Sequence, residues 1–275
     1  MRFGLDVAQQ RMPWDELVRR VQLAEVLGFD GVWGFDHFQP MYGDGPGETF
    51  EGMTTLAALA GLTTRIRLGL LVTGVTYRHP SVFAAQALTI DHASHGRLEL
   101  SLGAAWFGAE HQELGIAFPP TGERMSLLED TIEIVTRLFT GDVVSYDGHV
   151  VSLRDARMRP TPVQHPRPPI WIGGSGPRRT LPLVAEHADV WHAFGTPKSL
   201  RDASARLDQL AVEVGRDPAD ILRAGSLSLD DLDTARKHAA GWRDAGYGYL
   251  VCGWPEAGDA QVERFARDVM ADFSA

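Results

Sequence analysis

An aspartate followed by a histidine is the pair of side chains in this sequence best suited to proton transfer. Asp36-His37 directly follows the apolar segment 31–35, which is typical of a strand. A histidine with a pKa near neutrality can move a proton or hydrogen-bond a developing charge, and a neighbouring carboxylate can bias it. The alternative is an ordinary surface-loop pair. The position at a predicted strand end makes His37 and Asp36 our catalytic candidates.

A glycine-rich segment is the second candidate, and it suits anion binding. Gly173-Gly174-Ser175-Gly176 follows the apolar segment 169–172 and precedes a predicted helix. Small residues let several backbone amides point at one anion, and the amino terminus of a helix adds a favourable dipole. The alternative is a plain glycine-rich turn.

Two arginines after this segment favour the anion site. Arg178 and Arg179 lie in the expected first turn of the helix. Cations are unfavourable there unless an anion neutralises them. The segment is neither a Walker loop nor a dinucleotide fingerprint, so we expect a phosphate site of another kind.

Aromatic side chains at predicted strand ends suit a flat, conjugated ligand. Phe38 follows the second predicted strand, Trp106 follows the fourth, and Trp191 lies on a later one. We expect these three residues to line a substrate pocket, with Glu110 as a polar contact. The alternative is that the aromatic side chains pack in the core and that Glu110 begins a solvated helix.

The elements that must position these residues alternate between strand and helix about eight times. This alternation predicts an α/β protein, a (β/α)8 TIM barrel whose strands carry ligands at their carboxyl ends. An open Rossmann-like sheet is the alternative. The predicted strands are residues 3–7, 31–35, 68–73, 98–102, 169–172, 189–193, 221–226 and 247–252. The predicted helices are residues 13–27, 53–63, 81–92, 123–139, 181–187, 198–214, 230–245 and 259–273.

One stretch breaks the alternation. Residues 143–146 and 149–153 are two strand-prone arms around Asp147-Gly148, which predicts a hairpin with a tight turn. Five prolines in residues 157–169 predict an extended connector. We interpret residues from about 140 to 168 as an insertion in a single domain of residues 1–275.

Composition excludes several classes of protein. The 275 residues carry a net charge of −10, which argues against a nucleic-acid or anionic-membrane binder. No run of 18 apolar residues and no leader-like segment is found, so we expect a soluble, cytoplasmic protein. Cys252 is the only cysteine and the zinc motifs of hydrolases are missing, so we expect no disulfide and no metal.

Four segments taken in order resemble a known family. Residues 32–40, 71–80, 98–115 and 169–191 together are similar to the luciferase-like monooxygenase superfamily, and within it to the branch that depends on the deazaflavin coenzyme F420. The similarity extends from residue 3 to about residue 194. The family fold is a (β/α)8 barrel with insertions.

The resemblance implies a cofactor site. In the family, the third strand ends in a non-proline cis peptide against the flavin ring, which by position is Gly74-Val75, next to Thr73. The resemblance also places Asp36 and His37 beside the reactive ring.

The same resemblance places Gly173, Gly174, Ser175 and Gly176, with Arg178, on the cofactor phosphate. Sugar-phosphate dehydrogenases of this family carry a glutamate where this chain has Trp106. This departure favours a hydrophobic substrate.

The leading hypothesis is therefore F420-dependent hydride transfer to or from a small organic molecule, with His37 exchanging the proton. The first alternative is an FMN-dependent monooxygenase that uses oxygen and a partner reductase. Two others are a metal-dependent hydrolase built on Asp36, His37, Asp189 and His192, and a non-catalytic carrier of flavin or deazaflavin. Family members are commonly dimers, so we expect a homodimer.

Overall fold

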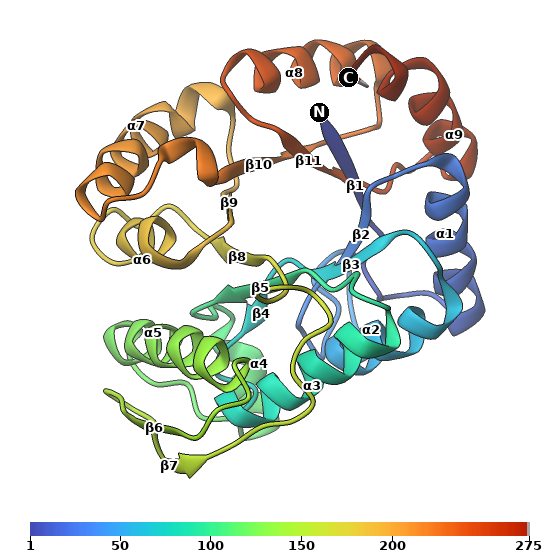
Figure 1. Ribbon diagram of the computed structural model, residues 1–275. Coiled ribbons are helices and arrows are strands. Elements are labelled where there is room, and N and C mark those ends of the chain that lie inside the picture. The colour runs from blue at the N-terminus through green and yellow to red at the C-terminus, as the bar shows by residue number, and fades with distance from the viewer. Residues whose placement is uncertain (274–275) are drawn as a thin grey trace.

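Nine strands form one parallel sheet that curls into a barrel (Figure 1). The structure is a computed structural model that describes residues 1–273. The strands of this sheet follow the order β3-β2-β1-β11-β10-β9-β8-β5-β4. A parallel bridge between Leu68 and Leu98 joins β3 to the chain just before β5 and so closes the ring. Because β3 and β4 are two pieces of one strand position, the barrel has eight positions. The predicted (β/α)8 barrel is confirmed, and the open-sheet alternative is wrong.

The observed elements alternate as predicted, with bounds that shift by up to five residues, the largest shift being the end of the last helix. The barrel strands are β1 (Arg2–Asp6), β2 (Gly31–Gly34), β3 (Arg67–Leu70), β4 (Thr73–Gly74), β5 (Leu100–Gly103), β8 (Ile170–Gly173), β9 (Val190–His192), β10 (Leu222–Leu227) and β11 (Tyr249–Gly253). The helices are α1 (Trp14–Leu27), α2 (Gly52–Leu62), α3 (Pro80–Ala93), α4 (Gly108–Leu114), α5 (Thr121–Leu138), α6 (Thr180–His187), α7 (Pro197–Glu213), α8 (Leu232–Asp244) and α9 (Asp259–Asp268), with 3-10 turns at Pro218–Asp220 and Met270–Phe273.

The first helix illustrates why the periodic segments were predictable. In α1, Leu17, Val21 and Ala24 recur at helical spacing and are buried against the barrel. The helix ends at Gly28, whose φ of 90° lies in the left-handed region. The N–H of Gly28 donates to the carbonyls of Ala24 and Glu25 in the last turn. Sequence spacing and a glycine stop therefore define this element without tertiary information.

The barrel interior is filled by large aromatic side chains rather than by a pore. Trp33, Trp171 and Tyr249 are buried together, with the Trp33 and Trp171 rings 4.3 Å apart. The indole of Trp33 donates to the Tyr249 hydroxyl at 3.1 Å, and the indole of Trp171 donates to Glu99 at 2.6 Å. Their polar atoms are thus satisfied inside the core, which burial requires.

The predicted insertion contains the two-stranded sheet of β6 (Val144–Asp147) and β7 (Ser152–Ala156), which lies beside α5 (Figure 1). The turn is longer than the Asp-Gly dipeptide predicted, because Asp147 pairs with Ser152 across four loop residues. Asp130 of α5 explains the longer loop: its buried carboxylate accepts the backbone N–H groups of residues 149, 150 and 151. Burial alone would raise the pKa of Asp130, but these hydrogen bonds lower it, so the carboxylate stays ionised.

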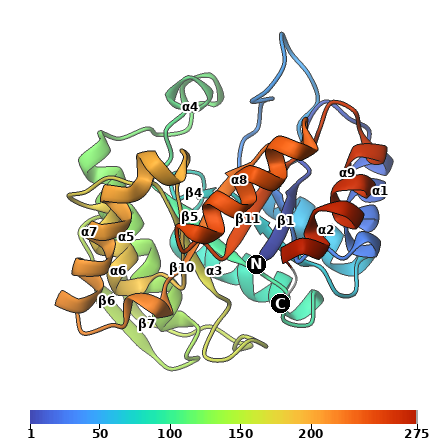
Figure 2. The same ribbon diagram turned by 90° about the horizontal axis from the view of Figure 1, so that it is seen from above.

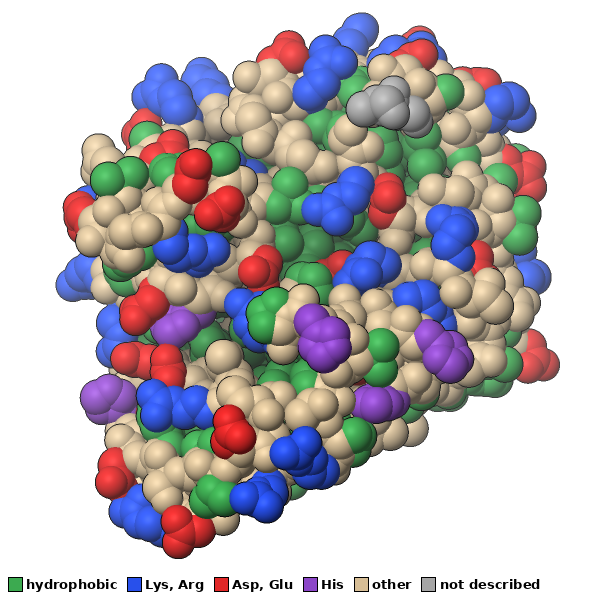
Figure 3. All heavy atoms as spheres, in the orientation of Figure 1, with side chains coloured by type: hydrophobic (Ala, Val, Ile, Leu, Met, Phe, Trp, Pro, Cys, Tyr) green, Lys and Arg blue, Asp and Glu red, His purple; other side chains and the backbone are tan. Residues whose placement is uncertain are grey.

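The two ends of the barrel differ. Figure 2 shows α4 and the loop between β2 and α2 projecting on one side, while both chain ends lie on the other. Figure 3 views the molecule from the side of the chain ends, where cationic and anionic side chains are interspersed around exposed apolar groups. Within residues 1–273, no helix combines the length and the apolar character that crossing a membrane requires. All carboxyl strand ends meet on the side of α4, where a barrel of this kind binds ligands.

Candidate active site

A cavity of about 450 Å³ opens at the carboxyl ends of β4, β5, β8 and β9. This volume is in the range of small-molecule sites. Its wall is mostly apolar, and its polar side chains include Asp36, His37, Arg124 and His192. Two aromatic side chains at its mouth are unusually exposed, Trp106 at 68% and Phe194 at 75%. Exposed rings around an apolar cavity indicate a site that a ligand covers.

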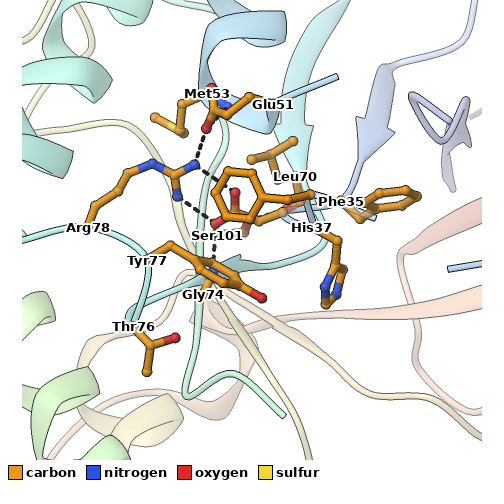
Figure 4. Close-up of polar contacts among 12 residues, drawn as sticks. Phe35, His37, Glu51, Met53, Leu70, Gly74, Thr76, Tyr77, Arg78 and Ser101 are labelled. Carbon is orange, nitrogen blue, oxygen red and sulfur yellow. Dashed lines mark hydrogen bonds and ion pairs between the residues drawn. The ribbon is translucent and has the colours of Figure 1, made fainter. Parts of the chain in front are cut away.

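Asp36 anchors the cavity wall through Arg78. The buried Asp36 carboxylate accepts both terminal nitrogens of Arg78, at 2.6 and 2.8 Å, and the backbone N–H of Gly74 at 2.9 Å. Arg78 also pairs with Glu51, as Figure 4 shows. Burial lowers the pKa of Arg78, but these two carboxylates outweigh it and raise that pKa. Asp36 is therefore an ion-pair anchor that joins the ends of β2 and β4, and its charge is already neutralised.

His37 is held by Glu110 and faces the cavity. Its Nδ1 lies 3.1 Å from a Glu110 oxygen, and its side chain is 13% exposed. The other Glu110 oxygen accepts the backbone N–H groups of Phe38 and Gln39, at 2.7 and 2.9 Å. A carboxylate can only accept, so Nδ1 of His37 carries the hydrogen and Nε2 is left for a ligand. Such an arrangement is suited to exchanging a proton with a bound molecule.

Helix α4 closes this part of the site by two buried side chains. Glu110 accepts the hydroxyl of Tyr77, and burial followed by this carboxylate raises the pKa of Tyr77. Nε2 of His111 lies 2.6 Å from the Thr76 hydroxyl, and its ring stacks on Tyr77 at 4.6 Å. Glu110 was expected to touch the substrate, but it is fully buried behind His37 and does not line the cavity. It positions His37 instead.

The cis peptide lies three residues before the expected position. It joins Leu71 to Val72, not Gly74 to Val75. Both Leu71 and Val72 line the cavity, together with Gly74. The resemblance located the feature only to the end of the third strand, whereas the strand pairing actually breaks after Leu70 and resumes at Thr73.

Two glycines make room for this cis segment. A Cβ at Gly103 would lie 2.5 Å from the Val72 side chain, and one at Gly173 would lie 3.0 Å from it. Glycines on β5 and β8 therefore leave room for the Val72 side chain in the cavity wall. Of the other residues expected here, Thr73 and Val75 are buried and do not line the cavity.

The glycine-rich segment lies at the rim. Gly173 and Gly174 line the cavity, while Ser175, Gly176 and Arg178 lie on the exposed loop that leads to α6. Within residues 1–273 the Arg178 guanidinium has neither a hydrogen bond nor an ion pair, so it is available to an anion. Gly173 thus has a packing role beside Val72 as well as a position at the rim.

Arg124 is a site residue that the sequence analysis missed. It is largely buried at the first turn of α5 and lines the cavity. It donates to the carbonyls of Ala104 and Pro119, at 3.1 and 2.6 Å, and to the Thr121 hydroxyl. No carboxylate within the described residues pairs with it. Arg178 was selected because a cation in the first turn of a helix suggests a bound anion. The same argument could have selected Arg124, which lies in the first turn of α5.

The expected aromatic residues divide into two groups. Trp106 lines the cavity with its ring 6.0 Å from that of His37. Trp191 does not line it: its ring is fully buried in the outer core and its indole donates to the Gly174 carbonyl at 2.7 Å. Phe38 packs edge-on against Tyr77 at 5.1 Å, outside the lining. His192, the residue after Trp191, faces the cavity instead, and burial lowers its pKa to about 4, so it is neutral.

The four residues of the metal-hydrolase alternative do not form one cluster, because Asp36, His37 and His192 line the cavity and Asp189 does not. Asp189 accepts the N–H of Ile170 and pairs with Arg167 at the amino ends of β8 and β9, far along the strand from the carboxyl rim. Asp36 is occupied by Arg78. In the described part of the chain, no group of three or more histidine, cysteine, aspartate or glutamate side chains is placed to hold a metal.

A parallel barrel with an apolar cavity at its carboxyl end defines the class of TIM-barrel proteins with a ligand site on that face. The chain belongs to the luciferase-like monooxygenase family, whose model matches residues 1–266.

Several of the similar proteins are named for coenzyme F420. The chain is 35% identical over 181 residues to an F420-dependent glucose-6-phosphate dehydrogenase of Microbacterium testaceum, covering 66% of this chain and 53% of that protein. It is 32% identical over 243 residues to a 5,10-methylenetetrahydromethanopterin reductase of Archaeoglobus fulgidus, covering 87% and 68%. A solved F420-dependent secondary alcohol dehydrogenase, in complex with an F420-acetone adduct, has the same fold, with a TM-score of 0.87 over 98% of both chains at 17% identity. The chain spans only about half the length of the glucose-6-phosphate dehydrogenases that it matches.

Proposed function

We propose that this protein is a coenzyme F420-dependent oxidoreductase that transfers a hydride to or from a small organic molecule. The observation that carries the proposal is His37, fixed by Glu110 and facing an apolar cavity beside the Leu71–Val72 segment. Curated relatives whose names state that they depend on F420, such as the glucose-6-phosphate dehydrogenase named above, support the choice of cofactor.

The cavity fits a cofactor with a flat ring and an anionic tail. Val72, Gly103 and Gly173 leave a wall with few protruding atoms, on which a planar ring can lie. Among the described residues that line the cavity, Arg124 is the one lysine or arginine, and within residues 1–273 Arg178 at the rim has no partner. We assign these two arginines and the amides of Gly174, Ser175 and Gly176 to the negatively charged part of the cofactor.

His37 is the proposed proton-exchanging residue. When bound, a deazaflavin supplies a hydride acceptor or donor at carbon. Loss or gain of a hydride by an alcohol or carbonyl carbon is accompanied by loss or gain of a proton at oxygen. Nε2 of His37 is free to take or give that proton, because Nδ1 is occupied by Glu110. Asp36 holds the wall in place through Arg78 and Gly74.

Titration with oxidised F420 and, separately, FMN tests the cofactor assignment. We expect F420 to quench tryptophan fluorescence with a dissociation constant in the micromolar range or tighter, and Arg124→Ala to weaken binding by about 10-fold or more, because a charge-assisted contact contributes about 1.5–3 kcal/mol. Arg137→Ala on the same helix, which removes an exposed pair with Glu133, is the matched control. Binding of FMN alone would favour the two-component monooxygenase with a partner reductase, and binding of neither would contradict the proposal.

Turnover separates an enzyme from a carrier. F420 bound tightly with no reduction or oxidation of F420 across a panel of alcohols and carbonyl compounds would favour a non-catalytic binding protein. A single domain with an insertion near residues 140–168 and a cytoplasmic location stay predictions.

The homodimer is proposed on the basis of α2 and α3, which lie side by side (Figure 1). Residues 52–62 and 80–90 contain no charged side chain, although the chain as a whole carries 62 charged residues (26 Lys and Arg plus 36 Asp and Glu). Between the two helices runs a groove of about 330 Å³ lined by side chains such as Met53, Ala57 and Ala85. Two adjacent helices whose outer faces carry no charge suit a protein interface, and a second copy would bury both.

A charge on this surface is expected to separate the protomers. Ala85→Glu places a carboxylate at an exposed position of α3, and we expect light scattering to report a monomer where the wild type is a dimer. Val212→Glu, at an exposed position of α7, is the matched control and should remain dimeric. A wild-type monomer, or an Ala85→Glu dimer of unchanged stability, would refute this interface.

A further inference from the structure

A second cavity of about 320 Å³ occupies the other half of the barrel mouth. It lies at the carboxyl ends of β1, β2, β10 and β11, whereas the first cavity lies over β4, β5, β8 and β9. The two share Leu71 and Phe194 as lining residues. The mouth is therefore divided into two compartments that meet at the cis segment and at an exposed aromatic ring.

Asp6, the last residue of β1, is the only carboxylate among the residues of the described part of the chain that line this second cavity. One of its oxygens, Oδ1, accepts the N–H of Ala8 at 2.9 Å. Within residues 1–273, Oδ2 has neither a hydrogen bond nor an ion pair. Neither lysine, arginine nor histidine is among the described residues that line the cavity. Burial, opposed by the Ala8 N–H, raises the pKa of Asp6 to about 6, as expected for a carboxylate without a counterion.

The remaining walls combine apolar surface with hydroxyl groups. Phe35, Leu227 and Val251 supply apolar surface, while Tyr42 and Ser226 carry hydroxyls. A substrate with a phosphate or carboxylate would bring its charge against Asp6 with no cation to compensate, which is unfavourable in a partly desolvated site. A neutral hydroxyl can donate a hydrogen bond to Oδ2, which accepts none from the protein.

We propose that the second cavity holds a non-reacting part of the substrate and that Asp6 selects an uncharged organic molecule with a hydroxyl in this part, which donates to Oδ2, while the reacting carbon faces His37 and the first cavity. This inference rests on the proposed function, because it assigns the first cavity to the cofactor. It names Asp6 as a specificity residue. It also excludes sugar phosphates, the substrates in the name of one group of relatives.

Three probes that share a cyclohexyl ring and differ in charge test this preference: cyclohexanol, cyclohexyl phosphate and cyclohexylamine. We expect saturation-transfer NMR and titration with the F420-loaded protein to rank cyclohexanol first. Asp6→Ala should weaken cyclohexanol about 10–100-fold, since a hydrogen bond to a charged group is lost. Asp6→Asn keeps an acceptor oxygen and should stay within a few-fold for cyclohexanol while improving cyclohexyl phosphate.

The controls separate a failure of this inference from a failure of the proposed function. Asp44→Asn removes an exposed carboxylate from the loop beside Tyr42 and should change neither ranking nor affinity. F420 binding by the Asp6 variants, in the other cavity, reports that they fold. A wild-type preference for cyclohexyl phosphate or cyclohexylamine, or an unchanged ranking in both Asp6 variants, would overturn the inference while F420 still binds. Failure to bind F420 would instead count against the proposed function, and the probe ranking measured without cofactor would still decide the role of Asp6.

Discussion

His37→Ala is expected to lower the turnover number for F420-linked oxidation or reduction by about 10²–10⁴-fold, the range for loss of a general acid or base. The residue lines the cavity, and its Nε2 is the nitrogen that Glu110 leaves free. The fold should tolerate the change, because His37 is not part of the hydrophobic core. The measurement is the steady-state change in F420 absorbance with an identified substrate.

Two variants make this result specific. His238→Ala, an exposed histidine on α8, should retain full activity. Glu110→Gln keeps the size of the side chain but places an amide, which can donate or accept, next to Nδ1 of His37. The tautomer of His37 is then no longer fixed. We expect an intermediate loss of turnover with a displaced pH profile, whereas a merely structural role of Glu110 would leave the profile in place. Full activity of His37→Ala with unchanged F420 affinity would remove His37 from the mechanism.

The fold was predictable where side-chain periodicity and glycine stops act locally, as in α1. It was not predictable where a strand is interrupted from within. The apolar run 68–73 predicts one strand, yet it is divided into β3 and β4 by the Leu71–Val72 segment. Helix α4 was foreseen only in the alternative that Glu110 begins a solvated helix, because its seven residues are too few to establish a periodic pattern.

The errors in the site follow from the alternation of side chains along a strand. Neighbouring strand residues point to opposite faces, so an error of one position moves a residue from the cavity to the outer core. Trp191 was expected to line the cavity and packs outward, while His192 faces inward. Gly74 lines the cavity while its neighbours Thr73 and Val75 do not.

The ion pair between Asp36 and Arg78 was beyond sequence reasoning for another reason. The two residues are 42 positions apart, and the barrel brings them together only when β2 and β4 lie on the same rim. Asp36 was correctly singled out, but as a partner for proton transfer. The structure instead gives its carboxylate three hydrogen bonds from Arg78 and Gly74, which leaves it no obvious role in moving a proton.

This anchoring role predicts a large loss of stability on Asp36→Ala. The substitution leaves a largely buried Arg78 with only Glu51 as a carboxylate partner, and it leaves the buried N–H of Gly74 without an acceptor. Removing one partner of a buried ion pair lowers the free energy of unfolding by about 3–5 kcal/mol. In a chain of 275 residues that corresponds to a decrease in melting temperature of roughly 5–9 °C. Thermal and urea unfolding followed by circular dichroism measure the change.

The control is an exposed aspartate–arginine pair. Asp202 pairs with Arg201 on α7 with both side chains at least 80% exposed, so Asp202→Ala should change stability by less than about 0.5 kcal/mol. Asp36→Asn should lie between the two, because its amide oxygen can still accept from Gly74 while its NH₂ group cannot accept from Arg78. If Asp36→Ala is no less stable than Asp202→Ala, Asp36 is not the anchor of this rim. Its buried carboxylate would then have to be explained by the bound cofactor rather than by the fold.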